Sequence, residues 1–399
     1  MAAVRALILS WEYPPLIEGG LARHVRKLAE GLAATGVDVH VLTRGTELSP
    51  PEEHLGGVHV HRVREPERPA QLDRFLAWVA QMNVDLLAAG VELGDEHRFD
   101  LVHGHDWLVA AAGDHLARRF RCPLLVTIHA TEHGRHQGWV ESYPQSHIHA
   151  EERWMANRAD RVIVCSRYMQ GHVADVFGIE QEPIEVIPNG IDPVEHVVAE
   201  DLVALRRRFA GPGERLVLLI GRLVYEKGFQ LALEALPGMI ERLGDVRFVV
   251  AGSGTHEAEL RAQAAALGLD RHGEFLGWVG DDVLRGLYRV ADLAVVPSIY
   301  EPFGLVALEA MAAGCPCLVA DTGGLREVVP HERAGLRFRA SDPEALADAA
   351  IRLLTDRRLS RRLVTAASAH VLHFDWDDVA RRTALVYADL TASRSLSTG

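Results

Sequence analysis

Cysteine, long apolar runs and positive charge are all scarce in this sequence. Four cysteines among 399 residues are too few for a disulfide framework. Cys315 and Cys317 lie between a predicted helix and a predicted strand, so we interpret them as buried small residues rather than redox groups. The uncharged run at residues 310–320 is among the longest and is too short for a transmembrane helix. We therefore expect neither a disulfide-stapled scaffold nor a membrane-spanning segment.

The charge balance limits the classes of partner. The chain has 42 Lys and Arg against 55 Asp and Glu, a formal net charge of -13. Such a surface repels nucleic acid and anionic lipid on average, so we expect neither nucleic-acid binding nor membrane contact. The apolar segment at residues 4–10 has the length of a buried strand rather than of a signal-peptide core, which makes the cytoplasm the expected compartment.

Several common catalytic motifs are absent. The sequence has no G-x-S-x-G nucleophile elbow and no phosphate-binding loop ending in GK[ST]. The loop after the first predicted strand also lacks the G-x-G-x-x-G pattern of dinucleotide-binding domains. These absences argue against a serine hydrolase, a P-loop nucleotidase and a nicotinamide-dependent dehydrogenase.

Short apolar runs alternate with helical patterns along the first half of the chain. Residues 21–34 carry an apolar stripe at helical spacing, and residues 71–91 predict a long helix. The runs that predict strands are residues 4–9, 37–42, 58–63, 101–103, 124–128 and 161–165. Repeated strand–helix units with continuous apolar strands predict parallel sheets covered on both faces.

The same alternation restarts in the second half. A turn-rich segment at residues 184–193 predicts a linker, and a strongly buried strand follows at residues 216–220. This predicts two doubly wound α/β domains, residues 1–192 and residues 193–375. Ligands bind such sheets beyond the carboxyl ends of the strands, so two facing sheets would place the site in the cleft between the domains.

Two loops that follow predicted strands carry candidate binding residues. Gly19 and Gly20 would let the backbone approach a ligand closely, with the next helix N-terminus facing an anion. A plain strand–helix turn is the alternative there. Arg222 and Lys227 follow the strand at residues 216–220, and a guanidinium with an ammonium suits a diphosphate. Solvated surface charge is the alternative for this pair.

A third loop, at residues 298–305, gives the strongest evidence for a ligand-binding site. It leads into a predicted helix whose first N–H groups, those of Phe303, Gly304 and Leu305, would be unpaired and would stabilise a phosphate. Seven residues separate Glu301 from Glu309, which would lie about two turns along the helix. Both carboxylates can accept hydrogen bonds from sugar hydroxyls. A capping Glu and a surface Glu are the alternative, which leaves the apolar neighbours of Glu309 unexplained.

Histidines are concentrated after two neighbouring predicted strands, in residues 103–107 and 127–136. Metal binding is one interpretation, but the HExxH motif is absent and no cysteine accompanies these histidines. We favour polar contacts with a hydroxylated ligand and predict no metal site.

Taken together, these motifs resemble those of the retaining glycosyltransferases of family 4, and the resemblance covers nearly the whole chain. It rests on the E-x7-E pattern from Glu301 to Glu309, on Arg222 with Lys227, on the double-glycine loop and on residues 186–192. Residues 10–15 and 103–107 resemble the glycogen and starch synthase branch, and in particular the shorter actinobacterial glycogen-synthase-like α-glucan glucosyltransferases. The resemblance implies the GT-B fold, two Rossmann-like domains facing across a cleft.

The resemblance also implies a role for each matching residue. In the second domain, Arg222 and Lys227 would bind the donor diphosphate, and Glu309 would bind the ribose hydroxyls. Glu301 would bind the donor sugar and the distal phosphate together with the amides of Phe303, Gly304 and Leu305. The main chain near Val279 would contact the base. In the first domain, Gly19 and Gly20 would pack against the donor, His129 would contact the reacting sugar, and Asp106 would lie on the acceptor side. Residues 376–399 would form a helix that crosses back to the first domain.

The implied reaction is transfer of a hexose, glucose by the branch resemblance, from an ADP-, UDP- or GDP-sugar to an acceptor hydroxyl. An α-1,4-glucan is the acceptor that the branch implies, and no cofactor or metal is expected. Ile17 stands where the glycogen synthases carry the Lys of a K-x-G-G loop, and the donor base stays open. The alternatives are a small-molecule or lipid acceptor, a nucleotide-sugar epimerase, a pyridoxal-dependent phosphorylase and a sugar-binding protein.

Overall fold

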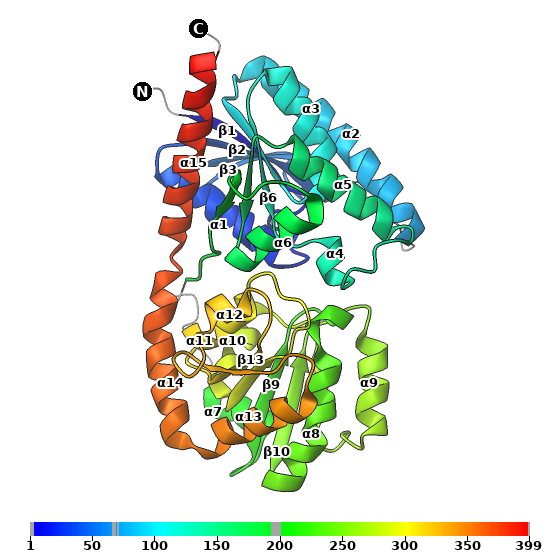
Figure 1. Cartoon of the computed structure of the whole chain (residues 1–399), viewed down its shortest axis with the longest axis vertical. Helices are drawn as coiled ribbons and strands as arrows, with labels where there is room; N and C mark the ends of the chain where they lie inside the picture. The colour runs from blue at the N-terminus through cyan, green and yellow to red at the C-terminus, as the bar shows by residue number, and fades with distance from the viewer. Residues whose placement is uncertain (1–3, 66–68, 70–71, 193–200, 398–399) are drawn as a thin grey trace. The chain divides into compact units, whose positions relative to one another are not determined.

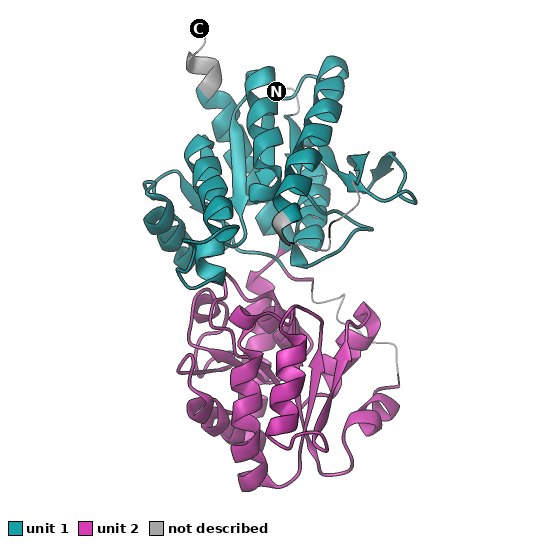
Figure 2. Ribbon diagram, turned by 90° about the vertical axis from the view of Figure 1, so that its right-hand side faces the viewer, with its two compact units in different colours: residues 1–190, 376–399 teal, residues 191–375 magenta. Residues whose placement is uncertain are grey.

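Parallel strands alternate with helices through both halves of the chain. The computed structural model describes residues 4–65, 69, 72–192 and 201–397. The chain divides into two units: unit 1 holds residues 1–190 and 376–399, and unit 2 holds residues 191–375 (Figure 2). The predicted division came two residues later along the chain, and the predicted start of the second domain, residue 193, lies outside the described residues. Both units are Rossmann-like, and each is described by itself.

Unit 1 contains one large sheet. Its strands are β1 (Arg5–Leu9), β2 (Asp38–Gly45), β3 (Glu52–Leu55), β4 (Val58–Arg64), β5 (Leu101–His105), β6 (Leu124–Ile128), β7 (Arg161–Val164) and β8 (Ile184–Val186). They lie in the order β3-β4-β2-β1-β5-β6-β7-β8, and all neighbours are parallel except β3 and β4. Strands β1, β2, β3 and β6 of this sheet are labelled in Figure 1. The sequence did not predict β3, because its residues are polar and mostly exposed and so give no apolar run.

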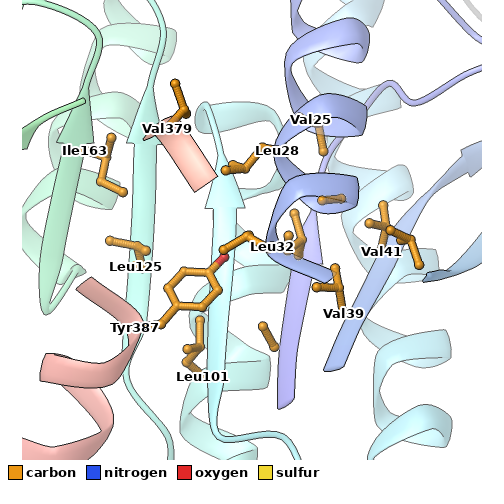
Figure 3. Packing of buried hydrophobic residues seen from close by; sticks show 14 of the residues in the cluster. Val25, Leu28, Leu32, Val39, Val41, Leu101, Leu125, Ile163, Val379 and Tyr387 are labelled. Carbon is orange, nitrogen blue, oxygen red and sulfur yellow. The ribbon is translucent and has the colours of Figure 1, made fainter. Parts of the chain in front are cut away.

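The helices of unit 1 cover this sheet. They are α1 (Gly20–Ala34), α2 (Leu72–Glu96), α3 (Ala110–Phe120), α4 (Glu132–Arg135), α5 (Gln145–Arg158), α6 (Arg167–Phe177) and, from the end of the chain, α15 (Trp376–Ser397). The core beneath α1 contains the predicted stripe residues Val25, Leu28 and Leu32 together with Val379 and Tyr387 of α15 (Figure 3). Burying an aliphatic side chain of this size contributes about 1.5–3 kcal/mol, so this contact ties the end of the chain to its beginning.

Within the described helices, the segment Arg74–Glu96 of α2 is long and apolar enough to cross a membrane by length and composition. The sequence analysis did not identify it, because charged residues interrupt the run. It predicted a helix at residues 71–91; residue 71 lies outside the described residues and the helix continues to Glu96. In the structure α2 packs against α3 and against strands β2 and β4, as a helix that covers a sheet does.

Unit 2 contains a fully parallel sheet. Its strands are β9 (Arg215–Ile220), β10 (Val246–Ala251), β11 (Gly273–Gly277), β12 (Leu293–Val296), β13 (Cys317–Ala320) and β14 (Leu336–Phe338), in the order β11-β10-β9-β12-β13-β14. Its helices are α7 (Leu202–Phe209), α8 (Phe229–Leu243), α9 (Glu257–Ala266), α10 (Asp281–Val290), α11 (Leu305–Ala312), α12 (Leu325–Val328), α13 (Pro343–Thr355) and α14 (Arg357–His370). Cys315 and Cys317 are buried free thiols, which confirms their predicted burial.

Candidate active site

The strand order of each sheet reverses at one place, and doubly wound sheets bind ligands at such a reversal. In unit 2 the chain runs outward from β9 in one direction and from β12 in the other, so the reversal lies between these two strands. Lys227 follows β9 and Glu301 follows β12. In unit 1 the reversal lies between β1 and β5, which precede Gly19 and Asp106 respectively. These four candidate residues therefore lie at the reversal of their own sheet.

Lys227 and Glu301 meet in unit 2. Lys227 ends a short 3-10 helix, Tyr225–Lys227, and its Nζ donates to Glu301 Oε2 at 2.8 Å. The hydroxyl of Ser298 donates to the same carboxylate oxygen at 3.0 Å. Glu301 is buried, with 8% of its surface exposed, so both hydrogen bonds lie largely out of water. A charge-assisted bond in such a place holds the ammonium and the carboxylate in fixed positions.

Glycines let the loops of unit 2 approach one another closely. Gly228 has φ +69°, and a Cβ there would lie 2.0 Å from the carbonyl oxygen of Pro297. Gly324 donates its N–H to the Glu301 carbonyl at 2.9 Å, and a Cβ on it would lie 2.3 Å from the Pro302 carbonyl oxygen. No other residue type fits such contacts without displacing backbone. The loops after β9, β12 and β13 are thereby packed against each other around the Lys227–Glu301 pair.

The N-terminus of α11 carries unpaired backbone donors. Gly304, with φ +118°, is the N-cap, and no side chain caps the helix. Among the described residues, the N–H groups of Phe303, Gly304 and Leu305 donate no loop or cap hydrogen bond. These donors follow directly after the buried Glu301. Free N–H groups and the helix dipole together favour an anion at this place.

Glu309 is oriented by a neighbour that the sequence analysis missed. The Tyr288 hydroxyl, on α10, donates to Glu309 Oε2 at 2.8 Å. Burial, with the charge of Glu309, raises the pKa of Tyr288 well above its usual value, so the phenol stays a donor at neutral pH. Glu309 is the fifth residue of α11, just over one turn from its start, rather than two turns along as expected. The sequence around Glu309 is apolar and gives no sign of this contact, because Tyr288 lies on another helix.

The other two candidates of unit 2 lie at the same edge of the sheet. Arg222 follows β9; its side chain is about half exposed, and its guanidinium lies 4.0 Å from Glu226 Oε1. Val279 follows β11, beside the exposed Trp278. Because β11, β10 and β9 are adjacent parallel strands, Val279 and Arg222 both lie beyond carboxyl ends. Val279 lies at the outer strand β11 of this edge, and Arg222 lies at β9, next to the reversal.

In unit 1 a buried carboxylate holds the double-glycine loop. Glu12 Oε2 accepts the N–H of Glu18 at 2.6 Å and the N–H of Gly19 at 3.2 Å. Gly19 is the N-cap of α1 and Gly20 its first residue. Burial raises the pKa of Glu12, while these backbone donors act in the opposite direction. Glu12 was not predicted as a site residue; its position in an otherwise apolar strand-to-loop junction was the available signal.

Asp106 and His129 are linked at the ends of β5 and β6. Asp106 Oδ1 accepts the backbone N–H of His129 at 2.8 Å, and Asp106 has φ +60°, an unusual backbone angle outside glycine. Burial raises the pKa of Asp106 to about 6. Burial lowers the pKa of His129 to about 3, so this imidazole is neutral at pH 7. It can therefore exchange hydrogen bonds with a ligand without carrying charge.

Two further histidines surround His129. His105 Nδ1 and His129 Nε2 share a hydrogen bond of 3.0 Å, and the ring of His24, on α1, lies 4.6 Å from that of His129. The sequence analysis missed His24, although a polar residue beside the apolar stripe of α1 was a signal. Ring nitrogens of the three residues lie within 4.8 Å of one another, so they could hold a metal ion. The 3.0 Å bond already uses one nitrogen of each of two rings, and the absence of a metal from this group of three stays a prediction.

Two of the other predicted histidines, His103 and His136, have structural partners. His103 is fully buried, and its two ring nitrogens bond to the Tyr387 hydroxyl at 2.8 Å and to Thr127 Oγ1 at 2.7 Å. His136 lies 3.0 Å from the carboxylate of Glu132, four residues earlier. His103 thus joins α15 to the sheet and leaves no ring nitrogen for a ligand.

Segments in both halves of the sequence match known protein families. Residues 18–195 match the family described as Glycosyltransferase Family 4, and residues 205–370 match Glycosyl transferases group 1. The chain is 39% identical to a glycogen synthase of Mycobacterium tuberculosis over 397 residues, covering 96% of this chain and 94% of the relative. It is 32% identical to a D-inositol 3-phosphate glycosyltransferase of Salinispora tropica, covering 94% of this chain and 82% of the relative.

A solved structure extends the similarity to three dimensions. A sucrose-phosphate synthase from Thermosynechococcus elongatus superimposes with a TM-score of 0.84 at 26% sequence identity, covering 98% of this chain and all of that one. The similarities of sequence and of fold therefore extend over both units.

Proposed function

We propose that this chain, which belongs to glycosyltransferase family 4 and acts on a nucleotide sugar, transfers glucose with retention of the anomeric configuration to a growing α-1,4-glucan. The observation that carries the proposal is the buried Lys227–Glu301 pair directly before the uncapped N-terminus of α11. One ammonium, held by the Glu301 carboxylate, and a set of free backbone donors lie together at the reversal of a doubly wound sheet. A diphosphate with an attached sugar is the ligand that this combination fits.

Each part of the donor has a matching group in unit 2. Lys227 and Arg222 bind the diphosphate, and the N–H groups of α11 bind the phosphate next to the sugar. Glu301 accepts hydrogen bonds from the sugar hydroxyls while Lys227 holds it in place. Glu309, oriented by Tyr288, accepts hydrogen bonds from the ribose. The main chain near Val279 contacts the base.

The proposed step breaks the bond between the anomeric carbon and the phosphate oxygen. The acceptor hydroxyl forms the new bond from the same face, and its proton passes to the departing phosphate. Negative charge grows on the diphosphate during this step, and Lys227, Arg222 and the α11 amides stabilise it. Fixed donors aimed at developing charge contribute a few kcal/mol each. No metal is needed for this stabilisation, and we propose that transfer requires none.

The residues of unit 1 serve the sugar and the acceptor. Gly19 and Gly20, held by Glu12, present backbone to the donor. His129, as a neutral imidazole, contacts a hydroxyl of the reacting sugar. Asp106 fixes the His129 backbone and lies on the acceptor side. These roles rest on the family resemblance together with the hydrogen bonds that hold each group.

The similarity to a relative named glycogen synthase supports a glucan acceptor, because 39% identity extends over nearly the full length of both chains. A small-molecule acceptor is the second candidate. It is favoured by the 32% identity to a relative named for transfer to inositol 3-phosphate. The two candidates share the donor site and differ in the acceptor.

A donor and acceptor panel tests the proposal. ADP-, UDP- and GDP-glucose would each be incubated with and without maltooligosaccharide, and nucleotide release followed together with glucan length. We expect one donor to release its nucleotide much faster with the oligosaccharide, with chain growth. Release that ignores the oligosaccharide and rises with an inositol phosphate would move the acceptor to a small molecule. Conversion of the donor without any acceptor would favour an epimerase and contradict the proposal.

A further inference from the structure

Histidines cross three strands at the β3 side of the unit 1 sheet. His40 on β2 lies opposite His59 on β4, and His59 lies opposite His54 on β3. Residues 39 and 41 of β2 belong to the core beneath α1, so His40 and its cross-strand neighbours lie on the other face of the sheet. His61 continues the row on β4, and the ring of His97 lies 4.6 Å from that of His40. None of these residues takes part in the proposed transfer.

We propose that Asp38, His40 and His59 form a binding site for a divalent transition-metal ion, with zinc as the best match. The Nε2 atoms of both imidazoles face one carboxylate oxygen, Asp38 Oδ1, at 3.5 Å for His40 and 4.0 Å for His59. The potential ligand atoms of the three residues lie within 4.8 Å of one another. Ligands about 2.0–2.2 Å from a tetrahedral zinc lie about 3.3–3.6 Å apart, so only a small closure is needed.

The two imidazoles are arranged for a common ligand. Their rings are stacked, with centroids 4.7 Å apart and planes 20° from parallel. The side chain of His40 is almost fully buried, whereas that of His59 is 46% exposed. His40 thus gives the site a fixed ligand, and His59 can rotate to close on an ion that enters from solvent. A water would complete the fourth position of the tetrahedron.

One hydrogen bond and one ion-pair contact behind His40 support this assignment. His40 Nδ1 lies 3.1 Å from His61 Nε2, and His61 Nδ1 lies 3.9 Å from a carboxylate oxygen of Glu52. Metal-binding histidines characteristically donate their second ring N–H to such a partner, which fixes the tautomer. If His40 carries its proton on Nδ1 and donates to His61, its Nε2 lone pair faces the Asp38 carboxylate. A cation between these two acceptors removes their repulsion.

The surrounding charges are compatible with an ion. Burial lowers the pKa of His40 to about 3, so the ring is neutral and its lone pair is available at pH 7. Arg5 bonds to Asp38 Oδ2 at 2.5 Å and leaves Oδ1 for a ligand. Burial acts to raise the pKa of Asp38, but the hydrogen bond and the charge of Arg5, with the neighbouring histidines, lower it overall, so the carboxyl stays ionised. A carboxylate and two neutral imidazoles are a donor set that zinc prefers over magnesium or calcium.

The position in the sheet indicates a structural role. Asp38 is the first residue of β2, so the site lies at the amino-terminal end of the strands, whereas the candidate active-site loops follow carboxyl ends. A bound ion would join β2 to β4 near the short, polar edge strand β3. We therefore expect the ion to stabilise unit 1 without serving the transfer.

A zinc titration of the full chain, prepared without a polyhistidine tag and stripped by a chelator, tests the proposal. We expect one zinc per chain in competition with a chromophoric chelator. The exposed position of His59 makes His59→Ala a mild change to the apoprotein, and it should weaken binding by at least about a hundredfold. His61→Ala, which removes only the supporting bond, should weaken it by about tenfold. His147→Ala, on the exposed side of α5, is the matched control and should leave binding unchanged.

Three results would overturn the proposal. They are no binding at micromolar zinc, unchanged binding in His59→Ala, and loss of binding in His24→Ala, which would place the ion at the His24, His105 and His129 group instead. X-ray absorption of the zinc-bound chain gives an independent readout. It should show two imidazole nitrogens and a carboxylate oxygen at about 2.0–2.2 Å, and an all-oxygen shell would contradict the assignment.

Discussion

The ammonium of Lys227 lies 2.8 Å from the buried carboxylate of Glu301, although the two residues are 74 positions apart in the chain. The chain contains 42 Lys and Arg, of which only Lys27 and Lys227 are lysines. A lysine is a compact charge with rotatable donors, whereas an arginine presents a flat, wide fork. The pair joins the loops after β9 and β12 at the point where the sheet order reverses.

The first prediction concerns this pair. Lys227→Ala removes a hydrogen-bond donor that stabilises the negative charge developing on the diphosphate. We therefore expect turnover to fall by about a hundred- to a thousandfold or more. Glu301→Ala should produce a loss of similar order, and the double variant should lose little beyond the worse single variant, because the two side chains act as a unit. Steady-state nucleotide release measures this.

Lys27→Ala is the matched control, since it removes the other lysine, which lies on α1 in unit 1, whereas the groups proposed for the diphosphate lie in unit 2. Thermal unfolding should show that Lys227→Ala and Glu301→Ala retain the fold. Near-normal turnover in either variant would refute the site.

The second prediction concerns pH. Burial raises the pKa of Asp106 to about 6 and lowers that of His129 to about 3. We expect kcat/KM to decline below about pH 6 as Asp106 protonates, and His129 to contribute no titration between pH 5.5 and 8. Asp106→Asn cannot ionise, so its lower rate should lack this acidic limb. An acidic limb that persists unchanged in Asp106→Asn would assign the titration to another group.

The third prediction concerns the packing of the donor loops. Gly228→Ala places a Cβ 2.0 Å from the Pro297 carbonyl oxygen at a backbone φ of +69°. We expect it to destabilise unit 2 by about 2–4 kcal/mol and to weaken donor binding. Gly238→Ala, inside α8 with nothing within 4 Å of the added Cβ, should be neutral or stabilising by up to about 1 kcal/mol. Chemical denaturation compares them, and equal effects would contradict the close-approach argument.

The fourth prediction distinguishes the proposed structural zinc site from the transfer reaction, which we propose requires no metal. We expect full turnover in the presence of a strong chelator, because the α11 amides and the basic side chains stabilise the diphosphate. The same chelator should lower the Tm of the wild-type chain and leave the Tm of His59→Ala unchanged, because only the wild type holds the proposed zinc. A strict metal requirement for turnover would contradict the proposed chemistry.

The fifth prediction concerns a buried carboxyl near the unit 1 site. Glu152 accepts the N–H of Glu132 at 2.9 Å, and burial raises its pKa from 4.5 to about 8. The folded chain therefore binds this proton more strongly than the unfolded chain between these pH values. The contribution of Glu152 to the free energy of unfolding should fall as pH rises from about 5 to 8, by an amount on the order of several kcal/mol at most.

Glu152→Gln removes this titration, so its unfolding free energy should depend less on pH than that of the wild type. Denaturation at pH 6, 7.5 and 9 measures the difference. Parallel pH dependences in the two proteins would show that Glu152 is not the responsible group.

The alternation of apolar strands and helices in the sequence predicted the two α/β units, because a parallel strand covered on both faces needs a continuous apolar run. It also placed Lys227 and Glu301 after strands. It could not show that they meet, since contact depends on which strands are neighbours at the reversal. The meeting of Tyr288 with Glu309 depends on helix packing and leaves no local signal.

The histidines of the proposed zinc site were missed for the same reason, because their contact depends on which strands are neighbours. His40 and His59 lie in separate strands, and each alone reads as a polar residue in an apolar run. Only the register of β2 against β4 brings them opposite one another. Likewise, the polar strand β3 carries no apolar pattern, so the third member of the histidine row could not be anticipated.

The central claim, retaining transfer from a nucleotide sugar, is tested most directly by proton NMR of one reaction mixture. The accepted donor would be incubated with maltooligosaccharide, and the anomeric signals of the product compared with the amount of nucleoside diphosphate released. The account predicts one new α-linked glucose on the oligosaccharide for each nucleotide released. A β-linked product, or free glucose equal to the nucleotide released, would contradict it.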